Sequence, residues 1–219
     1  VGGLVEVGTG KVSLASAGFE QYDAIGRSIA AQVLSPQRRA LVMPCKPARE
    51  SAPDDACARQ FLQAVGEQLY RRPLTDMELS TQVELANEAA TKLKGFHTGL
   101  EMSLASMFVQ LQFLFRQETV GPVKDVQGRF ELDAYSKASR LSFFLWDAAP
   151  DRRLLAAAAS GKLNTSAGLK EEVERLLASP RLEDGVRSFF GDMFGFDSFD
   201  SLAKDPTLYP NFTRTVADD

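Results

Sequence analysis

Apolar residues recur at intervals of three and four along most of this chain, and proline or glycine stands wherever the pattern stops. An α-helix turns once every ~3.6 residues, so this spacing places apolar side chains on one helical face. Strict alternation, the pattern of a half-buried strand, is weak and confined to residues 1–18. The pattern predicts an all-α fold: an irregular multi-helix bundle with a short N-terminal loop or hairpin and no parallel sheet.

Residues 19–120 are expected to form a first helical domain, preceded by an irregular N-terminal segment over residues 1–18. Thr75 and Glu78 have the spacing of a capping box, in which a hydroxyl and a carboxylate each bond to the other residue's backbone N–H. Residues 100–115 are apolar on nearly all sides, which predicts a central helix. The helices of this domain are predicted around residues 19–34, 58–69, 76–93 and 100–115, and Asp54 or Asp55 is expected to cap the second.

A loop of about ten residues, marked by Gly121, Pro122 and Gly128, is expected to separate this domain from a second one. The second domain covers residues 129–219, and we expect it to be truncated at its C-terminal end. No strand is predicted after residue 18. The helices of this domain are predicted around residues 132–146, 152–160, 166–177 and 186–194.

Composition excludes several classes of protein. Hydrophobic residues make up 44% of the 219 residues and charged residues 25%, close to a globular average and unlike a disordered chain. The net charge is −4 and the sequence has no basic run, which argues against nucleic acid as a partner. No stretch approaches about 18 uninterrupted apolar residues, so no membrane-spanning helix is predicted.

Cys45 and Cys57 enclose a polar, proline-rich segment without periodicity. A structural disulfide between them would close a short loop and stabilise the fold by about 2–3 kcal/mol in the chain-entropy model. We favour this pairing, which implies an oxidising compartment. The alternative is two unpaired cysteines, one in the loop and one buried in a helix.

Candidate catalytic and cofactor residues are scarce, so the catalytic residues stay unknown. His97 is the only histidine and stands at a helix start between two glycines, which favours a turn or solvent-facing role over catalysis or haem ligation opposite Met102 or Met107. The chain has no CxxCH haem attachment sequence and no zinc-ligand set, so no cofactor or metal is expected within it. The carboxylates are scattered, and a glycosidase pair is not suggested.

Two other groups of residues allow alternative interpretations. Arg71 and Arg72 precede a helix and could bind an anion, but pairing with carboxylates is the favoured interpretation. Five phenylalanines fall within residues 189–199, and the first three suit a core face. Phe196 and Phe199 lie beyond Gly195, and we expect their side chains to be covered either by the remaining C-terminal part of the polypeptide or by another chain. We favour the polypeptide, because the ends of the chain suggest a piece of a longer protein.

Two stretches resemble a known family. Residues 70–78 (YRRPLTDME) and 113–118 (FLFRQE) resemble a first motif, and residues 132–146 with Pro150 and Asp151 resemble a second, containing ASRLSFFLW. Both occur, in this order, in large exported helical proteins of uncharacterised function from planctomycetes and myxobacteria. The segment from Cys45 to Cys57 is similar to an element that precedes the first motif. Many members carry, or are encoded beside, a c-type cytochrome domain.

This resemblance implies export to the periplasm or the cell exterior, and further helical domains beyond the point that corresponds to Asp219. It supports the hypothesis that the chain is a scaffold segment of a haem-c-linked oxidoreductase assembly, with the haem elsewhere and a cytochrome c domain as partner. The alternative is a non-catalytic binding or structural module that associates with partner chains through exposed aromatics. A polysaccharide hydrolase is a third, weaker hypothesis. No catalytic residue follows from the resemblance, and whether the chain is an enzyme stays open.

Overall fold

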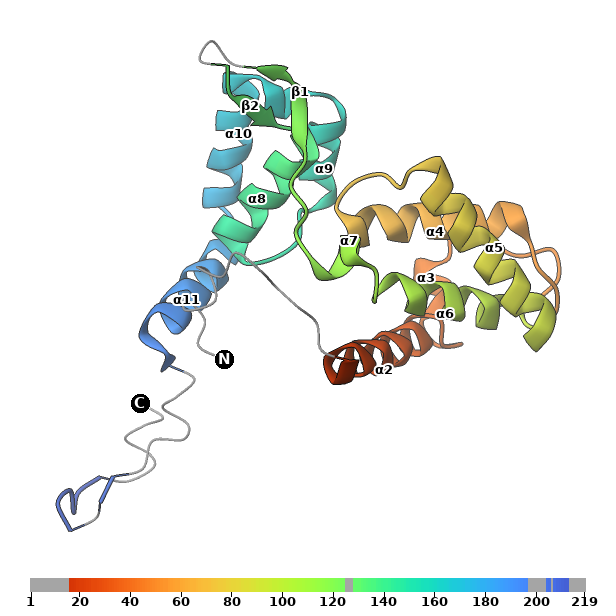
Figure 1. Cartoon of the computed structure of the whole chain (residues 1–219), viewed down its shortest axis with the longest axis horizontal. Coiled ribbons are helices and arrows are strands. Elements are labelled where there is room, and N and C mark those ends of the chain that lie inside the picture. Colours follow the sequence, from red (N-terminus) through yellow and green to blue (C-terminus); the bar gives the residue numbers. More distant parts are fainter. Residues whose placement is uncertain (1–15, 125–127, 197–203, 206, 213–219) are drawn as a thin grey trace.

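The computed structural model describes residues 16–124, 128–196, 204–205 and 207–212 (Figure 1). The predicted all-α fold is confirmed, because the described residues are mostly helical. The helices before the sheet are α2 (Ser16–Val33), α3 (Arg39–Val42), α4 (Asp55–Tyr70), α5 (Asp76–Leu93), α6 (Phe96–Met107) and α7 (Leu111–Leu114). The elements after them are β1 (Val120–Lys124), β2 (Phe130–Leu132), α8 (Ala134–Trp146), α9 (Arg152–Ala159), η1 (Lys162–Asn164), α10 (Ser166–Leu177) and α11 (Arg181–Phe194).

Helix α6 is the centre of the first group of helices, as the apolar sequence around it predicts. It packs against α2, α4 and α5 (Figure 1). Phe96, Leu100, Leu104 and Met107 are almost completely buried within one hydrophobic cluster. The helix begins earlier than expected, at Phe96, and passes straight through Gly99. Gly99 does not break the helix: it lets α6 approach the backbone of α5, because a Cβ there would overlap the Ala86 carbonyl oxygen.

The second group of helices surrounds α8, which contacts α9, α10, α11 and η1. Its buried cluster is separate from the first and contains Trp146, Leu154, Leu163 and Leu176. The Trp146 indole N–H donates to the Leu176 carbonyl oxygen at 3.0 Å, so the buried indole has its hydrogen-bond partner. In Figure 1, α7 lies between the two groups of helices.

The segment expected to be a loop contains a small antiparallel sheet instead. Strands β1 and β2 pair with Val120 opposite Leu132 and Lys124 opposite Phe130, with an irregular register between them. Sequence analysis predicted no strand here, because Gly121, Pro122 and Gly128 resemble turn residues when each is considered alone. Gly128 does occupy a left-handed turn conformation, with φ of 77°, next to the second strand.

The N-terminal prediction is only partly tested. Residues 1–15 lie outside the described residues, whereas residues 16–18, expected to be irregular, are the first residues of α2. Gly18 has no neighbouring atom within 4 Å of its Cβ position, and the helix continues through it. The first helix therefore begins three residues before the predicted position.

Helices α2 and α11 both expose an apolar face, and only that of α11 was predicted to be a core face. Helix α2 packs against α6 through Gly26 and Ala30, and its apolar stripe of Phe19, Tyr22, Ile25 and Ile29 faces away from the core, between 37% and 56% exposed. Helix α11 likewise buries Gly185 against α8. Its apolar residues are 42–56% exposed: Val186, Phe189, Phe190, Met193 and Phe194. Both helices contact their neighbours through a glycine, because only glycine permits the close backbone approach.

Gly99→Ala is expected to destabilise the protein by about 1–3 kcal/mol, because the new methyl group collides with the backbone of α5. Gly191→Ala is the matched control in α11, where a Cβ has open space, and should stabilise by about 0.5–1 kcal/mol through helix propensity. Urea unfolding of both variants measures the difference. Equal effects of the two substitutions would contradict the proposed packing of α5 on α6.

Candidate functional site

Arg71 connects the end of α4 to the segment that follows α7. The residue is in the left-handed conformation, with φ of 59°, and its side chain is largely buried. The guanidinium donates to the carbonyl oxygens of Leu69 at 2.9 Å, Gln112 at 2.5 Å and Phe115 at 2.9 Å. Burial, together with the charge of neighbouring arginines, lowers the pKa of Arg71. The prediction that this arginine pairs with a carboxylate is wrong, since it binds backbone carbonyls instead.

For Arg72 the carboxylate prediction is correct. Its guanidinium donates to both Glu78 oxygens, at 2.7 and 2.8 Å. The predicted capping box is confirmed, because the Glu78 carboxylate accepts from the Thr75 N–H at 2.8 Å and the Thr75 hydroxyl accepts from the Glu78 N–H at 3.2 Å. The hydrogen bond from Arg72 is the main reason that the pKa of Glu78 falls to about 2.

The segment that follows α7, which contains Arg116 and Glu118, forms one side of a surface groove with a volume of about 580 Å³. The opposite sides come from α8 and α11. The groove brings together residues of both sequence motifs, because Arg116 and Glu118 come from the first and Arg140 and Phe143 from the second. Its lining residues are Arg116, Glu118, Ser139, Arg140, Phe143, Phe144, Asp147, Gly185, Ser188, Phe189 and Asp192.

The charged side chains of the groove have different partners. The Arg140 guanidinium forms an ion pair with Glu118 at 2.8 Å. The Arg116 guanidinium lies over the ring of Phe143, 4.8 Å from its centroid, which is cation–π geometry. Asp147 accepts a hydrogen bond from the Ser188 hydroxyl at 2.6 Å. Within the described part of the chain, no hydrogen bond or ion pair engages the side chain of Arg116 or Asp192.

An apolar trough continues from the groove along α11. The trough has a volume of about 270 Å³, and it shares Phe144, Gly185 and Phe189 with the groove. Its other lining residues are Leu145, Leu182, Val186 and Phe190. Phe144 is 79% exposed, so aromatic surface is available where the two depressions meet.

A buried ionic cluster in the second group of helices is structural. Glu172 is 1% exposed and accepts hydrogen bonds from Arg175 at 2.6 Å, Lys162 at 3.1 Å and Arg153 at 3.3 Å. Arg175 also binds Asp151, the N-cap of α9, at 2.8 Å. Burial opposes the charge of this carboxylate, but the cationic partners outweigh it and lower the pKa of Glu172. The charges neutralise each other inside the fold, as a buried charge requires.

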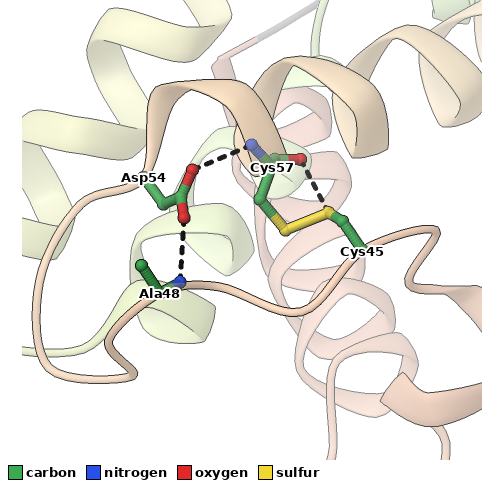
Figure 2. Close-up of a disulfide and its surroundings, with 4 residues drawn as sticks. All are labelled: Cys45, Ala48, Asp54 and Cys57. Carbon is green, nitrogen blue, oxygen red and sulfur yellow. Dashed lines mark hydrogen bonds between the residues drawn. A yellow bond between two sulfur atoms is a disulfide. The ribbon is translucent and has the colours of Figure 1, made fainter.

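The predicted disulfide is present, which excludes the alternative of two unpaired cysteines. Cys45 and Cys57 are bonded, with their Cα atoms 5.6 Å apart (Figure 2). The Asp54 carboxylate caps α4 by accepting from the Cys57 N–H at 3.0 Å and also accepts from the Ala48 N–H at 2.9 Å. The Cys45 sulfur lies 3.3 Å from the Cys57 carbonyl oxygen, a close contact rather than a hydrogen bond because the bonded sulfur carries no proton. Asp54 and the disulfide together hold the loop onto α4.

The residues considered as haem ligands do not fit a c-type haem. Covalent attachment needs a CxxCH sequence, whereas both cysteines of this chain form the disulfide. His97 is half-buried in the first turn of α6 rather than solvent-facing, and its Nδ1 lies 3.2 Å from the Arg39 guanidinium. Burial and then Arg39 lower the pKa of His97. Met107 is buried in the core, and the Met102 sulfur contacts Arg27 at 3.8 Å.

Among the residues that the structure describes, no group of three or more His, Cys, Asp or Glu side chains could hold a metal ion. No helix in this part of the chain has the length and apolarity to cross a membrane. Of the two aromatics predicted as a possible interface, Phe196 is 47% exposed, and Phe199 lies outside the described residues.

Sequence analysis did not identify the groove as a site. In the sequence, Arg116 and Arg140 stand only as letters of the two motifs, and Asp192 is one acidic residue among the phenylalanines of residues 189–199. The one available signal was that the first motif ends at residue 118 and the second begins at residue 132, near each other in the sequence. The two motifs come together in space because of how α8 and α11 pack, and no local sequence pattern predicts that packing.

Glu78→Gln is expected to destabilise the protein by about 1–2 kcal/mol at neutral pH, a value reduced by the partial exposure of Arg72. The lowered pKa means that ionised Glu78 stabilises the fold above about pH 4.5 and that this contribution disappears as the pH falls towards 2. Unfolding measured across this range should show a smaller pH dependence in the variant. Glu88→Gln, which removes an exposed pair with Lys92, should leave the profile nearly unchanged.

Replacing both Cys45 and Cys57 with alanine is expected to cost about 2–3 kcal/mol of unfolding free energy. Reduction of the wild-type protein should lower its stability by a similar amount, whereas the double variant should not respond to the reductant. Denaturant titrations with and without reductant measure both effects. Equal stability of oxidised and reduced wild-type protein would contradict a stabilising role for the bridge.

Comparison with known families matches two ranges of the chain. Residues 57–118 match the model of PSD5, a protein of unknown function (DUF1595), and residues 132–219 match that of PSD4, a protein of unknown function (DUF1592). No curated protein and no solved structure matches the chain. The first motif lies within the PSD5 range and the second within the PSD4 range. The chain therefore contains segments similar to two uncharacterised domain families, PSD5 followed by PSD4.

Proposed function

We propose that this chain is a helical scaffold segment of an exported multi-domain protein, part of an oxidoreductase assembly whose c-type haem lies outside the chain. The observation behind the scaffold role is that motif side chains are engaged in structural contacts. Arg71 binds backbone carbonyls, Arg72 binds Glu78 at a helix start, and Trp146 donates to a backbone oxygen. The haem association rests on the family resemblance.

The haem, if the assembly holds one, has to be attached by another segment or another chain. The cysteines of this chain are committed to the disulfide, and its lone histidine lies beside an arginine within the first group of helices. A scaffold role is compatible with this arrangement, because the chain then positions a cytochrome c domain without binding its cofactor.

Export is supported by the disulfide. Bonds of this kind persist in oxidising compartments such as the periplasm and the cell exterior and are rare in the reducing cytosol. Cys57 is 3% exposed and its partner closes a short surface loop, which is the arrangement of a structural bridge. We therefore place the protein in the periplasm or outside the cell.

We also propose that residues 19–120 and 129–219 are two helical domains. Each range contains its own cluster of buried apolar residues, one around α6 and the other around Trp146. The two family matches fall one in each range. Arg71 and the β1–β2 sheet lie at the connection between them.

A second candidate function is a non-catalytic binding or structural module that associates with partner chains through exposed aromatics. The apolar face of α11 favours this role. Phe189 and Phe194 are 53% and 56% exposed there, and Phe196 continues the aromatic surface beyond the helix. Large exposed apolar patches of this kind commonly mark protein interfaces. Phe199 is proposed as a further member of the interface.

The scaffold proposal is tested on the complete protein, isolated with its partners from its own cells without reductant. We expect visible absorption with a Soret band, and we expect peptide mapping to place the haem outside residues 1–219. An intact assembly without Soret absorption would overturn the haem-linked role. Partner association without haem would favour the second candidate instead.

The aromatic interface has its own test. Phe189→Asp combined with Phe194→Asp should release partner chains, because charge on this face removes apolar contact area. Leu41→Asp is the control, since Leu41 is 84% exposed on α3, away from α11. Size-exclusion chromatography of the complete assembly compares them. Retention of all partners by the double variant would exclude this surface as the interface.

A further inference from the structure

The surface groove holds opposite charges that do not pair with each other. Arg116 and Asp192 both line it, yet neither side chain has a hydrogen bond or ion pair with any other described residue. Asp147, also in the groove, binds only the neutral Ser188 hydroxyl. Arg140 is neutralised by Glu118. One guanidinium and two carboxylates therefore keep unused hydrogen-bonding capacity towards the groove.

Aromatic side chains line the groove together with these charges. The Phe143 ring supports the Arg116 guanidinium, and Phe144 and Phe189 are 79% and 53% exposed. The volume of about 580 Å³ falls within the range of ~300–1,000 Å³ that is typical of small-molecule sites. The groove thus combines a cationic group, acidic groups and apolar contact area in one depression.

We infer that this groove binds a zwitterion with an aromatic or aliphatic body. The Arg116 guanidinium would donate to the ligand's carboxylate in a charge-assisted pair, while the Asp192 and Asp147 carboxylates would accept from its ammonium group. The apolar body would lie on Phe143, Phe144 and Phe189. This inference goes beyond the scaffold role, and either can fail without the other.

Ligands with a single charge fit the groove less well. An anion that binds Arg116 also meets the field of Asp147 and Asp192, which opposes it. A cation bound to the aspartates meets Arg116. A neutral apolar compound makes no ionic contact with any of these groups. A zwitterion satisfies both signs of charge at once, and the two ionic contacts then orient its apolar body on the aromatic surface.

The test compares three compounds that share one aromatic body: L-phenylalanine with both charges, 3-phenylpropionate with only the carboxylate, and phenethylamine with only the ammonium. NMR titration of the 219-residue chain should give a dissociation constant on the order of 1 mM for phenylalanine. Each single-charge compound should bind about tenfold more weakly. Equal binding of all three compounds, or no saturable binding, would overturn the inference.

Two substitutions assign the contacts. Arg116→Gln should weaken phenylalanine and 3-phenylpropionate about tenfold and leave phenethylamine unchanged. Asp192→Asn should weaken phenylalanine and phenethylamine and leave 3-phenylpropionate unchanged. Arg187→Gln is the control, because Arg187 pairs with Glu183 on the same helix outside the groove and should change nothing. Loss of all binding in the control, or no effect of Arg116→Gln, would contradict the assignment.

A capped tripeptide, acetyl-Glu-Phe-Lys-amide, distinguishes the two sources of such a ligand. Tighter binding than phenylalanine assigns the charges to a polypeptide segment, and weaker binding assigns them to a free amino acid. Circular dichroism of each variant verifies folding. The comparison of compounds on the wild-type chain stands even where a variant fails to fold.

Discussion

The buried guanidinium of Arg71 fixes the path of the chain where it leaves the first group of helices. It binds the carbonyl oxygens of Gln112 and Phe115, and thereby fixes the direction in which the chain leaves α7. From there Arg116 reaches the Phe143 ring of α8, and the Thr119 N–H donates to the Ser136 hydroxyl at 2.8 Å. A buried cation bound only by carbonyl dipoles costs desolvation energy, which its several charge-assisted hydrogen bonds offset. The groove exists because this segment is held against α8.

The second group of helices is stabilised by contacts of its own. Trp146 fills its core, and the cations around Glu172 neutralise the buried carboxylate and connect α9, η1 and α10. Removing one member of such a cluster leaves an uncompensated buried charge, so these residues are constrained for structural reasons. Within the second motif, Trp146 is constrained in a similar way, because it is buried and donates to the Leu176 carbonyl oxygen. A helical frame with a surface groove is the consequence.

The sequence correctly predicted those features that are determined by residues a few positions apart in the chain. Asp54 as a cap, the Thr75–Glu78 capping box and the proline stops depend on neighbours along the chain, and all are present. The exposed face of α11 was predicted wrongly as a core face, because apolar periodicity shows that a face is apolar but not what covers it. The groove was missed for a related reason: Arg116, Arg140 and Asp192 come from segments that only tertiary packing brings together. The pairing of β1 with β2 was not predicted, because the glycines and the proline of this segment resemble turn residues.

The groove and the apolar face of α11 are physically continuous, so their occupants would influence each other. Phe144 and Phe189 line both the groove and the trough beside it. A partner that covers Phe189 changes the apolar surface available to a groove ligand, and by thermodynamic reciprocity the ligand changes the affinity of the partner by the same factor. The sign depends on whether the ligand and the partner contact the same ring atoms or opposite sides of the ring. Association of a partner on α11 and binding of a small ligand in the groove are therefore coupled wherever both contact Phe144 or Phe189.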